Sequence, residues 1–208
     1  VFYCNNINLE GEFLHLGKRY LLNTVFKDLT NSVFARDVTS ETGFYSNTFG
    51  SICTSNTFGS RCNYNTFVVS CTSNTFGSDC NSNILLSSCD SNTFGSNCDS
   101  NTLGSNCNNN TFGSGCRSNT FGSGCSSNTF GINFLSNSLS SGCDRNTFGT
   151  NCYYNTLNSK CSNNTFGNSF RDLYIKSLAN KNISMISDLI GKGYTITIEN
   201  MSNGQYCY

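Results

Sequence analysis

Apolar residues recur through the middle of the chain with a period of nine, separated by Asn, Ser and Thr. Residues 46 to 171 divide into fourteen units close to S-N-T-F-G-S-x-C-x, with no insertion or deletion. The alternation within S-N-T-F predicts a short strand, with positions two (Asn) and four (Phe) facing inward and positions one (Ser) and three (Thr) facing outward. So constant a register predicts a stack in which each unit is fixed against a neighbour.

Odd and even units differ consistently, which makes the structural repeat eighteen residues. The even units always carry Phe at position four and Gly at position five, whereas the odd units replace each of these four times. The odd units keep every Cys at position eight, but two even units carry Phe134 and Phe170 there. Nine extended residues span only about 30 Å, too short a perimeter to enclose a packed interior. We therefore predict an all-β fold, a parallel β-solenoid (β-helix or β-roll-like) of about seven coils, each built from two units.

Like residues in successive coils would form ladders inside the solenoid. We expect stacked Phe rings, an amide ladder of Asn side chains, and small apolar Cys side chains at the narrow ends of each coil. Gly at position five is expected to make the corner, because glycine readily adopts positive φ. The predicted structural core comprises Phe58, Phe76, Phe94, Phe112, Phe130, Phe148, Phe166, Asn56, Asn74, Asn92, Asn110, Cys71, Cys89, Cys107 and Cys125.

The chain has fourteen cysteines, which could be free thiols or paired in disulfides. Disulfides between successive coils are one possibility. Phe134 and Phe170 stand where Cys is expected, however, and would leave a cysteine that should be bridged without its partner. We therefore expect free, packed thiols. No CxxC pair occurs and His15 lies outside the repeats, so we predict no zinc site and no cofactor. A calcium site is not expected either, since Asp is only sporadic at the turns.

The two ends of the chain depart from the repeat. Residues 1–45 are predicted to form an N-terminal cap containing two degenerate coils, 23–26 and 31–34, and residues 172–208 a C-terminal cap with a strand at 194–199. The repeat array between them spans 46–171. Open solenoid ends need such covers, because they are unpaired sheet edges.

Composition limits the function. Asn and Ser number 34 and 32 of 208 residues, and 12 Lys and Arg balance 12 Asp and Glu. Binding to nucleic acid by phosphate neutralisation needs clustered basic residues, so it is not expected. The chain contains no run of 18 apolar residues, so no membrane span is predicted.

Two outward features could carry chemistry. An unbroken rank of threonines on the even units resembles the threonine ranks of insect ice-binding solenoids and is the candidate binding face: Thr57, Thr75, Thr93, Thr111, Thr129, Thr147 and Thr165. Some β-helices are polysaccharide lyases or hydrolases that use paired carboxylates, for which Asp90, Asp99 and Asp144 are the candidates. Their spacing does not match a pair, so we predict no enzyme and no catalytic residue.

The run S-N-T-F-G-S-x-C-x-S-N-T-F-G resembles the Asn- and Gly-rich nonapeptide arrays in surface and tail-fibre proteins of gut bacteria and their phages. This resemblance implies a structural and adhesive β-solenoid, a rigid spacer or receptor-contacting segment at a virion or extracellular surface. It implies a cell-surface glycan or protein as receptor, and self-association as a trimer or end-to-end filament. An ice-binding solenoid is the alternative, and a polysaccharide-acting β-helix enzyme the third.

Overall fold

The computed structural model describes residues 46–167 completely. Outside this range it describes the strands β1 (Phe2–Tyr3), β2 (Val25–Lys27), β3 (Val33–Phe34), β18 (Leu173–Ile175) and β19 (Ile196–Ile198). Everything said below about side chains concerns residues 46–167.

Each repeat unit contributes one two-residue strand, made by positions three and four. The odd units give β4 (Thr48–Phe49), β6 (Thr66–Phe67), β8 (Ile84–Leu85), β10 (Thr102–Leu103), β12 (Thr120–Phe121), β14 (Ser138–Leu139) and β16 (Thr156–Leu157). The even units give β5 (Thr57–Phe58), β7 (Thr75–Phe76), β9 (Thr93–Phe94), β11 (Thr111–Phe112), β13 (Thr129–Phe130), β15 (Thr147–Phe148) and β17 (Thr165–Phe166).

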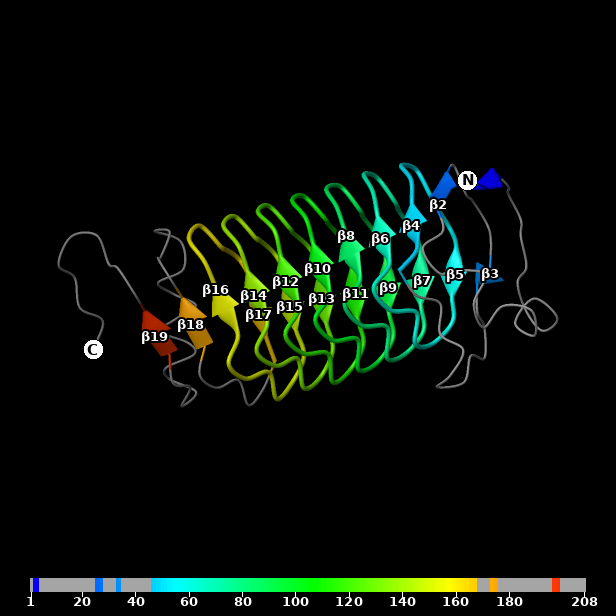
Figure 1. Ribbon diagram of the computed structural model, residues 1–208. Coiled ribbons are helices and arrows are strands. Elements are labelled where there is room, and N and C mark those ends of the chain that lie inside the picture. Colours follow the sequence, from blue (N-terminus) through cyan, green and yellow to red (C-terminus); the bar gives the residue numbers. More distant parts are fainter. Residues whose placement is uncertain are drawn as a thin grey trace.

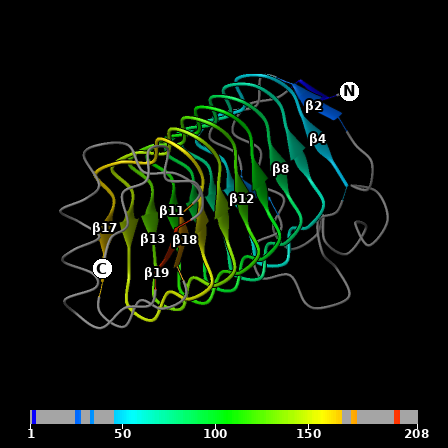
Figure 2. The same cartoon turned by 90° about the vertical axis from the view of Figure 1, so that its left-hand side faces the viewer.

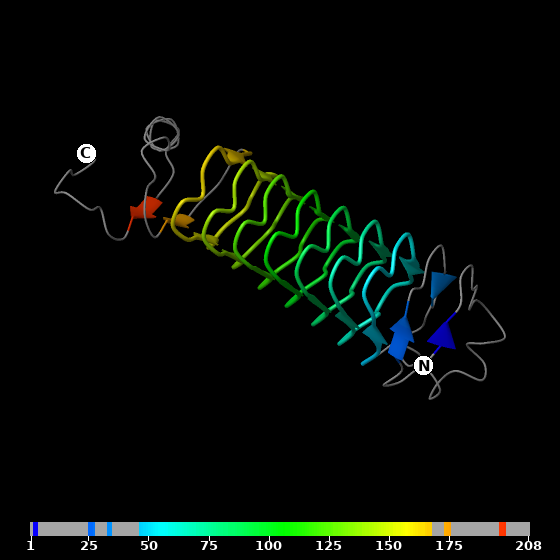
Figure 3. The ribbon, with the colours of Figure 1, turned by 90° about the horizontal axis from the view of Figure 1, so that it is seen from above.

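The strands form two parallel sheets, which face each other across the solenoid (Figures 1 and 2). The odd-unit strands belong to an 11-stranded sheet that begins with β1 and β2 and ends with β18 and β19; the even-unit strands and β3 form an 8-stranded sheet. Pairing joins residues eighteen apart, as in Thr102↔Thr120 and Phe112↔Phe130. The predicted fold class and the eighteen-residue coil are thus confirmed. Figure 3 shows the coils stacked along one axis from the N-terminal to the C-terminal repeats.

The corners are not where the sequence predicted them. Among the described residues, the glycines with positive φ are Gly115, Gly124 and Gly142, all at position seven, and none is at position five. Positions one and seven instead adopt the left-handed conformation in unit after unit, as at Ser100 (φ 57°) and Asn106 (φ 58°). These residues turn their amides toward the following coil: Ser100 N donates to Arg117 O at 2.9 Å. Strand amides donate the other way, to the preceding coil, so the backbone is bonded in both directions.

Glycine at position five has a different reason, the close approach of successive coils. A Cβ added to Gly95 would lie 2.7 Å from the carbonyl carbon of Gly77, which is closer than real Cβ atoms approach backbone. Where the odd units do carry a side chain at this position, they do so in stacked pairs: Val68 lies beneath Leu86, and Ser140 beneath Asn158. The prediction of a glycine corner at position five was therefore wrong.

The predicted asparagine ladder is present in both half-coils. All fourteen Asn residues at position two are buried, at 4% exposure or less. Asn83 N and Asn83 Nδ2 both donate to Asn101 Oδ1, at 2.9 and 3.1 Å. Asn101 Nδ2 in turn donates to Cys80 O at 3.0 Å. At Asn101 the amide thus bonds the preceding coil, the next coil and a turn carbonyl, which a side chain without both donor and acceptor could not do. Asn110 departs from the pattern, since its buried Nδ2 has no hydrogen-bond partner among the described residues.

Phenylalanine ladders fill the space between the sheets. Phe76, Phe94 and Phe112 stack with centroid separations of 4.5 Å and interplanar angles of 6° and 7°. Phe134, which replaces a Cys, is buried and stacks on Phe130 at 4.2 Å. At this point the Phe112–Phe130 separation widens to 6.1 Å with a 46° tilt. The larger side chain is accommodated by breaking the regular stack for one coil.

The degenerate coils expected before the repeats share the register of the sheets. Phe26 pairs with Phe49, and Phe34 with Phe58, so both occupy the equivalent of position four. The expected strand within 194–199 is observed as β19, which pairs parallel with β18. The rest of the predicted caps, 1–45 and 172–208, lies outside the described residues, as does Phe170.

Candidate functional site

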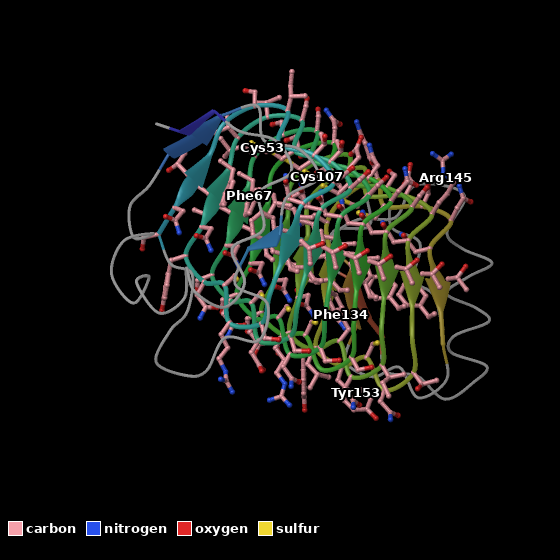
Figure 4. The ribbon with its side chains drawn as sticks, turned by 90° about the vertical axis from the view of Figure 1, so that its right-hand side faces the viewer. Cys53, Phe67, Cys107, Phe134, Arg145 and Tyr153 are labelled. Carbon is pink, nitrogen blue, oxygen red and sulfur yellow. The ribbon has the colours of Figure 1, made fainter. Side chains whose placement is uncertain are left out.

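Buried thiols are the most reactive groups that the coil brings together. All twelve cysteines in the described repeats are free and buried, in two columns that follow the eighteen-residue register. Ten of these thiols donate to the position-five carbonyl of the preceding coil; Cys107 Sγ, for example, lies 3.1 Å from Leu86 O. Figure 4 shows Cys53 and Cys107 inside the solenoid. Cys thus supplies a small apolar group with a weak donor, which explains its persistence at position eight.

Burial disfavours the thiolate, whereas hydrogen bonds with neighbouring thiols raise the pKa of some cysteines, such as Cys116, and lower that of others, such as Cys71. Cys152 has Phe134 at the equivalent position one coil back, so it has no thiol there, and desolvation by burial raises its pKa to about 11. Hydrogen bonding with the Cys98 thiol, followed by burial, raises the pKa of Cys116. Nucleophilic and metal-binding chemistry both need the thiolate, so these cysteines pack and donate rather than react.

Position nine carries a second ladder that sequence reasoning missed. Its Asn, Asp and Ser side chains accept the backbone N–H of the equivalent residue one coil on: Asp90 Oδ1 accepts from Asn108 N, and Asp99 Oδ1 from Arg117 N, both at 2.6 Å. Asp144 Oδ1 accepts from both the amide and the hydroxyl of Ser162, at 2.6 and 2.8 Å. In the sequence, the mixture of Asp, Asn and Ser at this position looks like a variable surface. All three have a short side chain that can accept a hydrogen bond, and this shared property is the signal that could have revealed the ladder.

The same bonds give the three candidate catalytic aspartates a structural task. Asp90 belongs to an odd unit and Asp99 to an even unit, so they cap different columns of amides. In the described residues, no group of three or more His, Cys, Asp or Glu is arranged to hold a metal ion.

The candidate threonine face lies on the 8-stranded sheet. Thr57 is half-buried and the other six threonines are exposed. The residue at position one, however, is left-handed throughout, as at Ser91 (φ 59°), so it lies off the two-residue strand. The structure therefore offers one threonine rank on the strands, not the paired ranks that an outward Ser-x-Thr suggested.

The two sheets differ in how strictly their outer faces repeat. On the even units, position three is always Thr and position five always Gly; on the odd units Ile84 and Ser138 intrude at position three, and four residues other than Gly stand at position five. Both faces share one backbone geometry and one hydrogen-bond pattern. The close approach of successive coils accounts for Gly at position five, but packing alone does not account for the constancy of Thr at position three of the even face.

Exposed apolar side chains concentrate on the odd units near the start of the array. Seven large hydrophobic residues in the described part of the chain are exposed, and five of them belong to three consecutive odd units: Ile52, Tyr64, Val69, Ile84 and Leu86, here called the apolar cluster. Ile52 N donates to Val69 O at 3.2 Å, which ties two members together. The cluster was not predicted, although Ile84 in place of Thr at position three and Leu86 in place of Gly at position five were its signal. Arg145 and Tyr153 point outward elsewhere on the rod (Figure 4).

No family model matches the chain, and neither does any curated protein or solved structure. The described residues contain no helix of the length and apolar character that crossing a membrane requires. Function must therefore be argued from the solenoid and its surface.

Proposed function

We propose that the chain is a structural and adhesive β-solenoid of a virion tail fibre or an extracellular surface fibre. The observation that carries this proposal is the continuity of the stack, in which fourteen Asn amides and two parallel sheets run in one register through every described coil. A stack of this kind resists bending and shear, because each coil is bonded to both neighbours. Such rigidity suits a spacer that holds a binding surface away from its anchor.

The apolar cluster is the surface we assign to receptor contact. Exposed apolar side chains that gather on one part of a surface are typical of interaction sites, and the three odd units that carry the cluster contain one charged residue, Asp90. An uncharged face of aliphatic, tyrosine and hydroxyl groups suits a cell-surface glycan or protein.

Two measurements test the proposal. Light scattering and electron microscopy of the purified chain should give a trimer or an end-to-end filament; a stable monomer would remove the fibre. A double variant, Ile84→Thr with Leu86→Gly, should lower binding to host cells at least several-fold. It introduces the residues that Thr102 and Gly104 supply one coil on, so the fold should be kept. The matched control is Ile132→Ser, which removes an exposed side chain outside the cluster.

Ice binding is the second candidate, and the constancy of Thr on the even face favours it. We expect thermal hysteresis to be lost in Thr93→Tyr and Thr111→Tyr and kept in Thr102→Tyr and Thr120→Tyr, which place the same ring on the opposite sheet. No freezing-point effect in the parent protein would remove this candidate. No hydrolytic role is proposed for Asp90, Asp99 or Asp144, since each already accepts a backbone amide.

A further inference from the structure

We infer that this solenoid is a reduced-state fold: it assembles where thiols are kept reduced, and the finished rod then protects its thiols from oxidation. The inference rests on the proposed fibre function only in that it chooses between two kinds of fibre. A virion fibre assembles in the cytosol before release, whereas a surface fibre exported unfolded would have to fold in an oxidising medium.

The geometry of the columns opposes in-register disulfides. Stacked residues in neighbouring parallel strands lie about 4.7–4.9 Å apart, and their Cβ atoms point the same way. A relaxed disulfide needs Cβ atoms about 3.5–4.5 Å apart. Bridging Cys89 to Cys107, for example, would pull together two coils that are held apart at fixed ladder distances, 2.9 Å from Thr102 N to Asn83 O and 2.7 Å from Gly104 N to Leu85 O.

A disulfide would also remove two partly buried hydrogen bonds. The Cys89 thiol donates to Val68 O and the Cys107 thiol to Leu86 O, both at 3.1 Å. Oxidation removes both protons, and the two position-five carbonyls lose their donors inside the rod. Leaving these polar groups without a partner destabilises the rod.

The unfolded chain has no such protection. Its cysteines recur every nine residues, so nearly every pairing between them is out of register with the coil. Each pairing converts two protein thiols and one low-molecular-weight disulfide into one protein disulfide and two low-molecular-weight thiols. A single wrong pairing blocks the stack, because every coil must share one register with its neighbours.

In the folded rod, by contrast, the thiols are protected from oxidation. In the described repeats eleven cysteines are 0% exposed and Cys161 is 2% exposed. An oxidant or alkylating reagent reaches them only when coils open. Fibres released from a reducing cell interior would therefore keep their thiols.

The experiment uses the full chain with Cys4→Ser and Cys207→Ser, which leaves only the repeat thiols. The chain is refolded from denaturant in reduced or in oxidised glutathione, and the yield of soluble rod and the disulfide map are measured. We expect a yield at least several-fold lower in oxidised glutathione, with scrambled and mixed disulfides. In the rod folded under reducing conditions, alkylation by N-ethylmaleimide should be at least about 10³-fold slower than in denaturant.

Equal yields in both buffers, with disulfides joining cysteines eighteen apart, would overturn the inference, as would alkylation of the native rod at the unfolded rate. A variant with all twelve repeat cysteines changed to Ser should refold equally in both buffers. If that variant does not fold, the alkylation rates of the parent decide. The mass and shape of the reduced rod test the fibre function independently, so the two proposals fail separately.

Discussion

Asn101 Oδ1 accepts two hydrogen bonds from the same residue of the preceding coil, from Asn83 N at 2.9 Å and from Asn83 Nδ2 at 3.1 Å. Its own Nδ2 donates to Cys80 O at 3.0 Å. Asn83 N and Cys80 O therefore depend on one side chain, which is itself 0% exposed, whereas Asn83 Nδ2 also donates to Cys62 O. No other common side chain of this size offers an acceptor and two donors in one plane.

Replacing Asn101 by Leu should therefore lower the free energy of unfolding by about 3–5 kcal/mol, since each orphaned buried group costs about 1–3 kcal/mol. Denaturant unfolding followed by circular dichroism measures the loss. The neighbouring exposed Thr102→Ala should change stability by less than about 0.5 kcal/mol. Similar losses in the two variants would contradict the ladder as the source of register.

Phe94 lies between Phe76 and Phe112, with both centroids at 4.5 Å. Phe94→Ala should cost about 3–5 kcal/mol, because it removes a buried ring and leaves a cavity. Phe94→Leu should cost less than about 1.5 kcal/mol, since the odd units already carry Leu at this position, as at Leu85 and Leu103. Equal effects of Ala and Leu on the unfolding midpoint would mean that volume does not matter there.

The sequence alone predicted those positions of the repeat whose role is filled by a single residue type. Phe at position four, Asn at position two and Cys at position eight were predicted to be inward, and the structure buries them in every described coil except the last, where Phe166 is only half-buried. The left-handed corners were not predicted because position seven accepts residues as different as Ile52, Asp79 and Gly115, so composition gives no signal for a left-handed backbone. The position-nine ladder was not predicted because three residue types with acceptor side chains share its role. The outer faces cannot be read from packing, and their ligand is not determined by the fold.

The revised account of glycine gives a matched pair of variants. Gly95→Ala should destabilise the rod by at least about 2 kcal/mol, because the new Cβ would meet backbone atoms of Gly77 and Ser78 at 2.7–2.8 Å. Gly142→Asn should cost less than about 1 kcal/mol, since that position has open space, φ of +72° and Asn in equivalent coils. Thermal unfolding of the two variants compares them. The reverse order would restore position five as the corner.

Alkaline pH should destabilise the rod through its thiols. Burial raises the pKa of Cys152 from 9.0 to about 11. Below pH 9.0 both folded and unfolded states keep this proton; between 9.0 and about 11 the unfolded chain loses it first, so stability falls as pH rises. Urea midpoints across this range should fall less steeply in Cys152→Ser than in the parent. Thr147→Ser, on the exposed face of the same unit, should keep the parental slope, and an equally reduced slope there would exclude the thiol as the cause.

Ile52 combines a left-handed backbone, φ of 64°, with 60% exposure of its side chain. A β-branched residue is strained in this conformation, and the strain is relieved by Asn, which occupies the equivalent position at Asn97 and Asn106. Ile52→Asn should therefore raise the free energy of unfolding by about 1 kcal/mol, whereas Ile52→Val, still β-branched, should not. If the apolar cluster contacts a receptor, the same Asn variant should bind host cells less well while being more stable. A variant that gains stability and keeps full binding would separate Ile52 from the receptor surface and leave its strain without a functional reason.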